Sequence, residues 1–398
     1  MRLPDALWRQ RPGMDRLLAA LDAAGGETRF VGGCVRDTLL GLEASDVDLA
    51  TRIAPEAVIR RLEEARIKAV PTGLAHGTVT AVIGGKPVEV TTLRRDLATD
   101  GRRATIAYTG DWREDAARRD FTINALSADP ASGEVFDYFG GLADLEAGRV
   151  RFIGDPLQRI AEDHLRILRF FRFHARFGKS APDEAALGAC AARANDLMAL
   201  SRERIADELL KLLALPEPTA TAALMIDYGI LRPVLPEIAG AGRLAALVAA
   251  EQAAGIAPEP IRRLAALLPP DAGVAADVAA RLRLSRRAAR RLVSAARPGI
   301  DARPEALAYR IGVPEAIDAI LLHGMPGADL QALAAWQRPR LPVGGGDLIA
   351  MGLEAGPQVA ATLQAIEQDW LDAGFPADRA AVRAIARRHV DQALRSSQ

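Results

Sequence analysis

Hydrophobic and polar positions divide the chain into two parts. Up to about residue 150, apolar runs of strand length alternate with helical stretches and polar turns, and from residue 155 on the apolar positions keep a helical period. The glycine pair Gly84-Gly85 joins two strand-like runs, which is a strong hairpin signal. The pattern predicts an α+β fold whose sheet lies in the first part, with strands near 30–31, 46–49, 77–83, 87–93, 126–128 and 134–138 and helices at 35–40 and 55–65.

A glycine turn is the first candidate for a binding site. The apolar pair Phe30-Val31 stops at Gly32-Gly33, where the missing Cβ atoms let backbone N–H groups approach an anion. The next helix would present its N-terminus to the same place, and Arg36 adds a planar set of donors. We interpret the turn as a phosphate-binding cradle, with an ordinary loop as the alternative.

A pair of aspartates follows this turn. Asp46 and Asp48 alternate with apolar residues, so a strand would place both carboxylates on one face. Two like charges that close repel unless a cation lies between them, and carboxylate oxygens suit Mg²⁺. The spacing predicts a metal site, with a solvated strand face as the alternative. Glu89, on another predicted strand, either completes that site or faces the solvent.

Two further stretches are rich in charge. Residues 94–120 have few periodic apolar positions, which predicts a mobile loop or flap that ends in Arg118-Arg119-Asp120. Residues 156–178 predict one helix on which Asp163, Arg166 and Arg169 share a face. A surface helix with Glu–Arg pairs is the alternative there.

Composition limits the class of protein. The 398 residues predict two to four domains, and the 51 basic residues balance the 51 acidic ones, so an RNA partner would need clustered arginines. Such clusters, with Arg290 and Arg291 in one of them, occur at 281–297 and near the C-terminus, although solvated helix faces explain them equally well. Two distant cysteines and the lack of a signal or membrane segment predict a soluble, cytoplasmic protein without a membrane partner. The oligomeric state stays open.

Three motifs together resemble one enzyme family. VGGCVRDTLLG followed by SDVDLAT, then RRDFTINAL, and then EDHLRILRFFRF with its EDxxR core resemble the class II CCA-adding tRNA nucleotidyltransferases and bacterial poly(A) polymerases. These belong to the polymerase-beta-like superfamily, and the resemblance spans nearly the whole chain. It implies a mixed-sheet nucleotidyltransferase head at 1–150 and an all-α neck at 151–215, body at 216–310 and tail at 311–398, the last contacting tRNA.

The resemblance implies transfer of CMP and AMP from CTP and ATP to the tRNA 3′ end, with release of pyrophosphate. Asp46 and Asp48 would be catalytic and hold two Mg²⁺ ions, and a third ligand, Glu89, stays open. The implied nucleotide-binding residues are Gly32, Gly33, Arg36, Arg119, Asp163, Arg166, Arg169 and Arg172, of which the last two would support the base-reading pair or the phosphates.

Base choice is chemically intelligible for the pair Asp163 and Arg166. Cytosine and adenine each present an amine beside an unprotonated ring nitrogen, whereas uracil and guanine present a carbonyl beside an N–H. A carboxylate that accepts and a guanidinium that donates therefore fit C and A and reject U and G.

Three alternatives remain at this point. A poly(A) polymerase shares these motifs, and so does a CC-adding or A-adding enzyme, although the intact flap resembles the loop that CCA-adding relatives need to change from C to A. A non-catalytic RNA-binding protein is more remote, because binding alone needs neither acid pair nor base-reading pair. Gly344–Gly346 predict a loop with Asp347 as a helix cap, since no phosphate-loop lysine follows.

Overall fold

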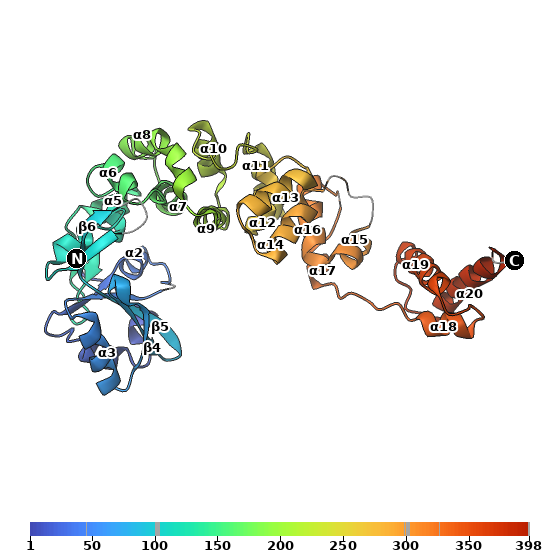
Figure 1. Ribbon diagram of the computed structural model, residues 1–398, viewed down its shortest axis with the longest axis horizontal. Coiled ribbons are helices and arrows are strands. Elements are labelled where there is room, and N and C mark those ends of the chain that lie inside the picture. The colour runs from blue at the N-terminus through green and yellow to red at the C-terminus, as the bar shows by residue number, and fades with distance from the viewer. Residues whose placement is uncertain (45, 100–103, 298, 300–302, 326, 397–398) are drawn as a thin grey trace. The chain divides into compact units, whose positions relative to one another are not determined.

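The computed structural model describes residues 1–44, 46–99, 104–297, 299, 303–325 and 327–396. They form two compact units (Figure 1). The first comprises Met1–Ala241 with Arg281–Leu284, and the second comprises Gly242–Ala280 with the residues from Ser285 on. The division into head, neck, body and tail at residues 150, 215 and 310 stays a prediction.

A seven-stranded mixed sheet forms the start of the first unit. Its strand order is β3-β4-β5-β2-β1-β8-β9, in which β2 and β5 are parallel and the other neighbours antiparallel. The strands are β1 Thr28–Val31, β2 Asp48–Thr51, β3 Lys68–Gly73, β4 Thr78–Ile83, β5 Lys86–Thr92, β8 Ser127–Ala128 and β9 Val135–Phe136. The predicted α+β class and mixed sheet are confirmed.

Local sequence explains most of this sheet. The hairpin between β4 and β5 turns at Gly84 and Gly85, whose φ angles of 54° and 74° are those that a two-residue hairpin turn needs. The sequence did not predict β3, because this edge strand is largely exposed and lacks an apolar alternation. Helices α1 Met14–Ala20, α2 Gly33–Leu39 and α3 Pro55–Glu64 pack beside the sheet and bury Leu17 and Leu62 together with Leu49.

The polar stretch 94–120 is not the simple loop that its sequence predicts. β6 Arg94–Thr99 and β7 Ala104–Tyr108 pair as an antiparallel ribbon, and α4 Trp112–Ala117 follows, capped by the Asp111 side chain. The pairing of the two strands uses backbone groups, which every sequence supplies, so this polar stretch carries no hydrophobic alternation that would predict its strands. The tip of the predicted flap, residues 100–103, lies outside the described residues.

Helices complete the first unit, and one of them differs from its prediction. The single helix expected over 156–178 is wrong, because α6 ends at Glu162 and α7 begins at Arg166. Between them Asp163 is extended, with φ −151° and ψ 107°, and its Oδ1 accepts a hydrogen bond from the Leu165 N–H at 3.1 Å. The helices are α5 Gly141–Ala147, α6 Pro156–Glu162, α7 Arg166–Phe177, α8 Glu184–Ala192, α9 Arg202–Leu213 and α10 Thr219–Asp227.

Aromatic packing holds α7 against the two segments that contain Phe121 and Phe152, which meet in an isolated β-bridge. The Phe121 ring lies 4.9 Å from that of Phe152 and 5.2 Å from that of Phe173, and Phe152 stacks on Phe170 at 5.9 Å. Phe121, Phe152 and Phe170 are at most 1% exposed. Because packed aromatic rings resist displacement, this cluster fixes which face α7 turns to these two segments.

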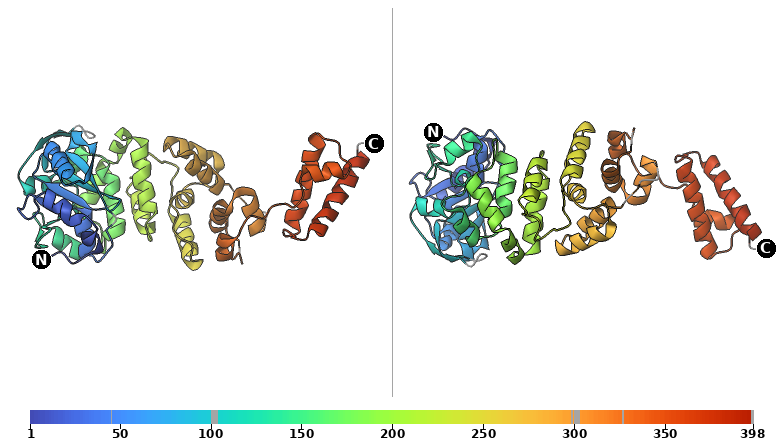
Figure 2. Two further views of the ribbon diagram at one scale, coloured as in Figure 1. Left: turned by 90° about the horizontal axis from the view of Figure 1, so that it is seen from below. Right: turned by 90° about the horizontal axis from the view of Figure 1, so that it is seen from above.

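Among its described residues, the second unit contains helices joined by loops and no strand. One apolar cluster surrounds Ile320 and Leu333, and another surrounds Ile366 and Trp370, where α19 and α20 lie side by side (Figure 2). Its helices are α11 Gly242–Ala253, α12 Pro260–Leu267, α13 Ala272–Arg281, α14 Arg286–Ala295, α15 Pro304–Ile311, α16 Val313–His323, α17 Leu330–Ala335, α18 Gly345–Ala350, α19 Pro357–Asp372 and α20 Arg379–Ser396.

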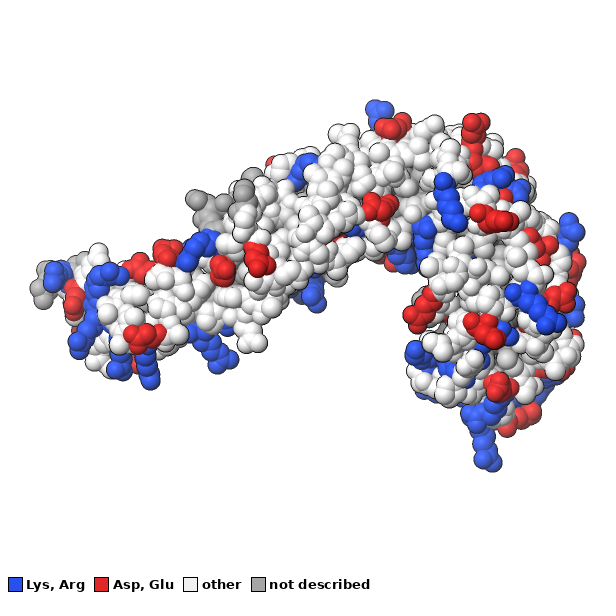
Figure 3. All heavy atoms as spheres, turned by 180° about the vertical axis from the view of Figure 1, so that it is seen from behind, with Lys and Arg blue, Asp and Glu red and all other residues white. Residues whose placement is uncertain are grey.

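Two details of the surface and of helix capping complete the fold. The cap of α18 is Gly344 rather than the predicted Asp347, which lies in the first turn and accepts the Gly344 N–H at 2.9 Å. Basic and acidic side chains are interspersed on the face drawn in Figure 3. Among the described residues no helix has both the length and the apolar character needed to cross a membrane.

Candidate active site

A cavity of about 520 Å³ in the first unit gathers most of the sequence-predicted site residues. It is bordered by the β1–α2 turn, the segment entering β2, the segment after α4, and the α6–α7 break with the exposed side of α7. Its lining residues are Gly32, Gly33, Arg36, Asp37, Asp46, Asp48, Arg118, Arg119, Asp120, Asn124, Asp163, Arg166, Arg169, Arg172, Phe173 and Arg176. Glu89 is the predicted site residue that does not line this cavity.

The glycine turn has a steric reason for its composition. Gly32 has φ 70° and ψ −125°, a conformation that side-chain-bearing residues rarely adopt. A Cβ at this position would lie 2.8 Å from Nη1 of Arg119. Glycine therefore lets the Arg119 guanidinium approach the turn, and two residues separated by 87 positions meet at one place.

Arg36 is buried and already engaged. It is 5% exposed, its Nε lies 2.7 Å from Oδ1 of Asp37, and its Nη1 donates to Oδ1 of Asn124. Its guanidinium also lies 4.3 Å from the Phe177 ring centroid. Burial lowers the pKa of Arg36, although the Asp37 carboxylate opposes that change. These contacts fix the position of Arg36 at the cavity wall. Its role in triphosphate binding stays a prediction.

The two aspartates reach one cavity without sharing one strand. β2 begins at Asp48, so Asp46 precedes the strand, and the period-two argument that placed both on it is wrong in that detail. Burial raises the pKa of Asp48 to about 6, and the charges of Glu89 and Asp46 add to this while Arg119 opposes it. A cation between the carboxylates would remove this cost, so the donor set fits a hard divalent ion.

Glu89 is the direct neighbour of Asp48 on the parallel strand β5. Residues paired in this way turn their side chains to the same face of a sheet, which explains why the Glu89 charge acts on Asp48. Among the described residues, no group of three or more His, Cys, Asp or Glu side chains is arranged to hold a metal ion. The role of Glu89 as a third ligand therefore stays a prediction.

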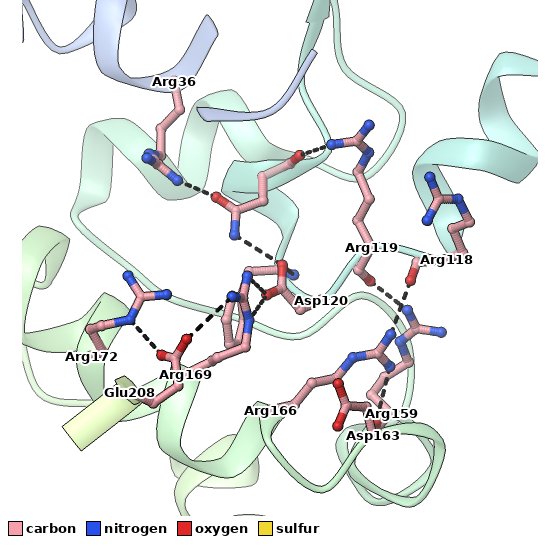
Figure 4. A network of polar contacts seen from close by, with 12 residues as sticks. Arg36, Arg118, Arg119, Asp120, Arg159, Asp163, Arg166, Arg169, Arg172 and Glu208 are labelled. Atoms are coloured by element: carbon pink, nitrogen blue, oxygen red, sulfur yellow. Dashed lines mark hydrogen bonds and ion pairs between the residues drawn. The ribbon is translucent and has the colours of Figure 1, made fainter. Parts of the chain in front are cut away.

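Asp120 ties the segment after α4 to α7 (Figure 4). Its Oδ1 accepts from the Phe121 N–H at 2.8 Å and from Asn124 Nδ2 at 2.9 Å, while its Oδ2 accepts from Arg169 Nε at 2.7 Å. Burial alone would raise the pKa of Asp120, but the Arg169 charge and these hydrogen bonds outweigh it and lower that pKa to about 2. The carboxylate is therefore ionised in the folded protein.

The proposed base-reading pair lies at the α6–α7 break. Arg166 donates from Nη1 to Oε2 of Glu162 at 2.5 Å. Its Nη2 donates to the Arg118 carbonyl at 3.1 Å (Figure 4). Asp163 is held by Nη2 of Arg204, which lies 3.2 and 2.9 Å from its two carboxylate oxygens. The break between α6 and α7 thus brings both side chains to the cavity. The sequence had predicted that one continuous helix would do this.

Glu208 of α9 anchors the other two arginines of α7. Its Oε2 accepts from Arg172 Nε at 2.6 Å and its Oε1 lies 3.7 Å from Arg169 Nη1, while the glutamate itself is 4% exposed. The two roles predicted for Arg169 and Arg172 were support of the base-reading pair and contact with phosphates. Their ion pairs favour support.

Sequence reasoning missed several lining residues. Asp120, Arg118 and Asn124 stood in a recognised motif without a role, and since Phe121 between Asp120 and Asn124 is extended, helical spacing does not predict their contact. Arg176 follows Arg172 one helical turn later on α7. Asp37 and Phe173 complete the set. No local signal indicates Arg204, because it contacts Asp163 across 41 positions.

A small mixed sheet with a glycine turn and an acidic pair, facing an arginine-bearing helix, defines the chain as a nucleotidyltransferase. Two family models match it, "Poly A polymerase head domain" at residues 28–151 and "Probable RNA and SrmB- binding site of polymerase A" at residues 181–241. The mitochondrial CCA tRNA nucleotidyltransferase 1 of Mus musculus is 35% identical over 373 residues, which cover 88% of this chain and 84% of that protein. The chain belongs to the class II CCA-adding enzyme and poly(A) polymerase family.

Other relatives agree with this assignment. The CCA-adding enzyme of Levilactobacillus brevis is 38% identical over 230 residues, covering 57% of this chain and 55% of that protein. The crystal structure of the Bacillus stearothermophilus CCA-adding enzyme in complex with CTP superposes with a TM-score of 0.75 at 27% identity, and covers 96% of this chain and 99% of that one. The family predicted from the motifs is confirmed.

Proposed function

We propose that this protein adds CMP and AMP to the 3′ end of tRNA, using CTP and ATP and releasing pyrophosphate. The observation that carries this proposal is the single cavity that joins the acidic pair, the glycine turn and the Asp163–Arg166 pair. Relatives named as CCA-adding enzymes support it, among them one solved with CTP. The partners are thus the tRNA 3′ end and the two nucleotides.

The reaction joins the tRNA 3′-oxygen to the α-phosphorus of the nucleotide and breaks the bond to pyrophosphate. Asp46 and Asp48 would hold Mg²⁺, which when bound lowers the pKa of the attacking hydroxyl and stabilises the leaving pyrophosphate. The Gly33 N–H and Arg119 are placed to bind and orient the triphosphate, while Gly32, whose own N–H donates to the Leu126 carbonyl at 3.0 Å, shapes the turn. Arg36 supports that wall of the cavity.

Base selection is assigned to Asp163 and Arg166. Hydrogen bonds to Glu162 and to the carbonyls of Arg159 and Arg118 use three of the five N–H groups of Arg166 within the described part of the chain. Donors therefore remain for the ring nitrogen of cytosine or adenine. Asp163 is 30% exposed at its side chain and keeps acceptor capacity for the exocyclic amine.

Poly(A) synthesis is the second candidate, because the matching head-domain family is described by that activity. The names of the mouse and lactobacillus relatives favour CCA addition, and the first of them covers most of the chain. A purely RNA-binding role leaves the acidic pair unexplained. A cytoplasmic location stays a prediction, since the mouse relative is named as mitochondrial.

One assay tests the proposal. The protein is incubated with Mg²⁺ and a tRNA that ends at the discriminator base, with CTP, with ATP, and with both, and the products are sequenced. We expect C residues from CTP alone and a CCA end from the mixture. Long A tails from ATP alone would instead establish poly(A) synthesis, and unextended tRNA in every reaction would refute nucleotidyl transfer. The Asp46→Ala, Asp48→Ala double variant is the control.

A further inference from the structure

Asn124 lies at the centre of the polar contacts around the cavity. It belongs to the 3-10 helix η3 Thr122–Asn124 and is 7% exposed. Its Oδ1 accepts from Nη1 of Arg36, its Nδ2 donates to Oδ1 of Asp120 at 2.9 Å, and its carbonyl oxygen accepts from Nη1 of Arg119 at 3.4 Å. One residue thus contacts both arginines on the triphosphate side and the aspartate on the helix side.

The chemistry of these partners fixes how the amide is oriented. A guanidinium only donates hydrogen bonds and an ionised carboxylate only accepts them. Asn124 has to accept from Arg36 and donate to Asp120 at the same time, which a neutral amide does in one orientation. Leucine of similar size offers neither group, and an ionised aspartate accepts from Arg36 but repels Asp120.

The contacts continue from Asp120 into the helix that carries the base-reading arginine. Asp120 Oδ2 lies 2.6 Å from Nη2 of Arg169 on α7, and Arg169 lies one turn after Arg166. At the other end Arg36 belongs to α2, which starts at the glycine turn. An uninterrupted series of hydrogen bonds therefore joins α2 to α7 through Asn124 and Asp120, and all four side chains border the same cavity.

We propose that Asn124 is a positioning residue that couples the triphosphate-binding side of the cavity to base choice. It holds Arg36 and Asp120 at fixed positions, and through Asp120 and Arg169 it sets where α7 presents Arg166. This inference rests on the proposed nucleotidyl transfer. Because base rejection depends on donors and acceptors placed to match the base, displacement of α7 costs selectivity as well as rate.

The test compares Asn124→Leu with the wild type and with Asn195→Leu, an exposed asparagine of the same unit outside the cavity. We expect Asn124→Leu to lower kcat/KM for both CTP and ATP by about tenfold, the usual effect of losing a hydrogen bond to a charged group. The preference for CTP over UTP should fall by about tenfold too. Asn195→Leu should match the wild type in both quantities. Unchanged selectivity in a folded Asn124→Leu protein would overturn the proposal.

An exchange of the two side chains gives a second test that does not depend on the leucine variant folding. In the Asp120→Asn, Asn124→Asp double variant, the carboxylate introduced at position 124 accepts from Arg36 and from the amide introduced at position 120, whose oxygen accepts from Arg169. The total charge is kept, and one hydrogen bond, from the Phe121 N–H, is removed. We expect each single variant to lose selectivity and the double variant to regain most of it, whereas equal losses in all three would contradict the coupling.

Binding measurements separate this proposal from the proposed function. CTP and UTP affinities are measured by calorimetry in the absence of tRNA, for the wild type and for Asn124→Leu. A narrower CTP-to-UTP affinity ratio in the variant supports the coupling even if the wild type fails to extend tRNA. If Asn124→Leu keeps the wild-type CTP-to-UTP affinity ratio and the wild type extends tRNA fully, the coupling is overturned while the proposed function stands.

Discussion

The Nη2 of Arg204 lies 2.9 and 3.2 Å from the two carboxylate oxygens of Asp163, so α9 holds the residue at the break between α6 and α7. Asp163 also accepts the Leu165 N–H at 3.1 Å. The orientation of the proposed base-reading carboxylate is therefore set by a helix that lies 41 positions further along the chain. Base choice should depend on Arg204 although it does not line the cavity.

Replacing Arg204 with alanine should loosen base choice. Without the guanidinium, the Asp163 carboxylate gains rotational freedom and presents its acceptor less consistently, so we expect the kcat/KM preference for CTP over UTP to fall by roughly tenfold. Asp163→Ala should remove more of that preference because the acceptor itself is gone. Single-nucleotide kinetics on a tRNA ending at the discriminator base measure both.

Arg202→Ala is the matched control on the same helix, since Arg202 contacts Met198 instead of the cavity. It should reject UTP as the wild type does. Rejection of UTP and GTP at the wild-type level in Asp163→Ala would remove Asp163 from base selection.

The acidic pair should be indispensable, and Glu89 should act through the metal. Asp48→Ala should lower nucleotide incorporation by about a thousandfold or more while tRNA affinity stays unchanged, because a single carboxylate holds a hard cation poorly. Glu89→Gln should raise the Mg²⁺ concentration for half-maximal rate by about tenfold, since Glu89 neighbours Asp48 on β5. Magnesium titrations of incorporation, with tRNA binding measured in parallel, provide both results.

Glu56 offers a control carboxylate, since it lies exposed in the first turn of α3. Glu56→Gln should need the same Mg²⁺ concentration as the wild type. If Glu89→Gln needs the same Mg²⁺ concentration for half-maximal rate as the wild type, Glu89 is not a metal ligand and only faces the solvent.

Motifs predicted which residues meet, but not how the backbone brings them together. Gly32, Asp48, Arg119 and Asp163 come from four separate segments and line one cavity, as the resemblance implied. Their local geometry was less predictable. The apolar positions keep a helical period on both sides of Asp163, so periodicity favours an unbroken helix. At the break, the Asp163 side chain instead accepts the Leu165 N–H.

Contacts between distant residues were the other limit. Arg36 meets Asn124 across 88 positions and Arg172 meets Glu208 across 36. Nothing in a single sequence shows which acid lies beside which arginine, because such pairs form only after the sheet and the helices pack. The sequence therefore indicated Arg36 as a donor for phosphate, whereas the structure shows much of its hydrogen-bonding capacity engaged within the protein.

The arginines of α14 should divide into two kinds. The sequence grouped Arg291 with Arg290, but Arg291 Nε lies 2.6 Å from Oδ2 of Asp318, which is 0% exposed. Its removal should destabilise the second unit by leaving a buried carboxylate with fewer partners. Exposed Arg286, Arg287 and Arg290 are the residues available to RNA phosphates.

Replacing those three exposed arginines with alanine should weaken tRNA binding most at low salt. The slope of log affinity against log salt should fall by roughly one for each RNA phosphate that the protein no longer neutralises. Binding isotherms at several salt concentrations measure it, with Arg291→Ala, followed by thermal unfolding, as the comparison. If the triple variant keeps the wild-type slope, these arginines of α14 do not contact RNA and the face they form is only solvated.

The stability contributed by Asp120 should vanish at low pH. Its pKa is lowered to about 2 in the folded protein, because Arg169 and the hydrogen bonds from Phe121 and Asn124 outweigh its burial. A carboxyl with a depressed folded pKa stabilises the fold above its unfolded value, near 3.8, and loses that contribution as pH falls toward 2. The shift corresponds to about 2 kcal/mol.

Urea unfolding measures this contribution. The free energies of unfolding of wild type and Asp120→Asn should differ most near neutral pH, and the difference should narrow below about pH 4. The exposed Asp207→Asn variant should show no such narrowing, and a gap for Asp120→Asn that is independent of pH would refute the ionised Asp120–Arg169 pair.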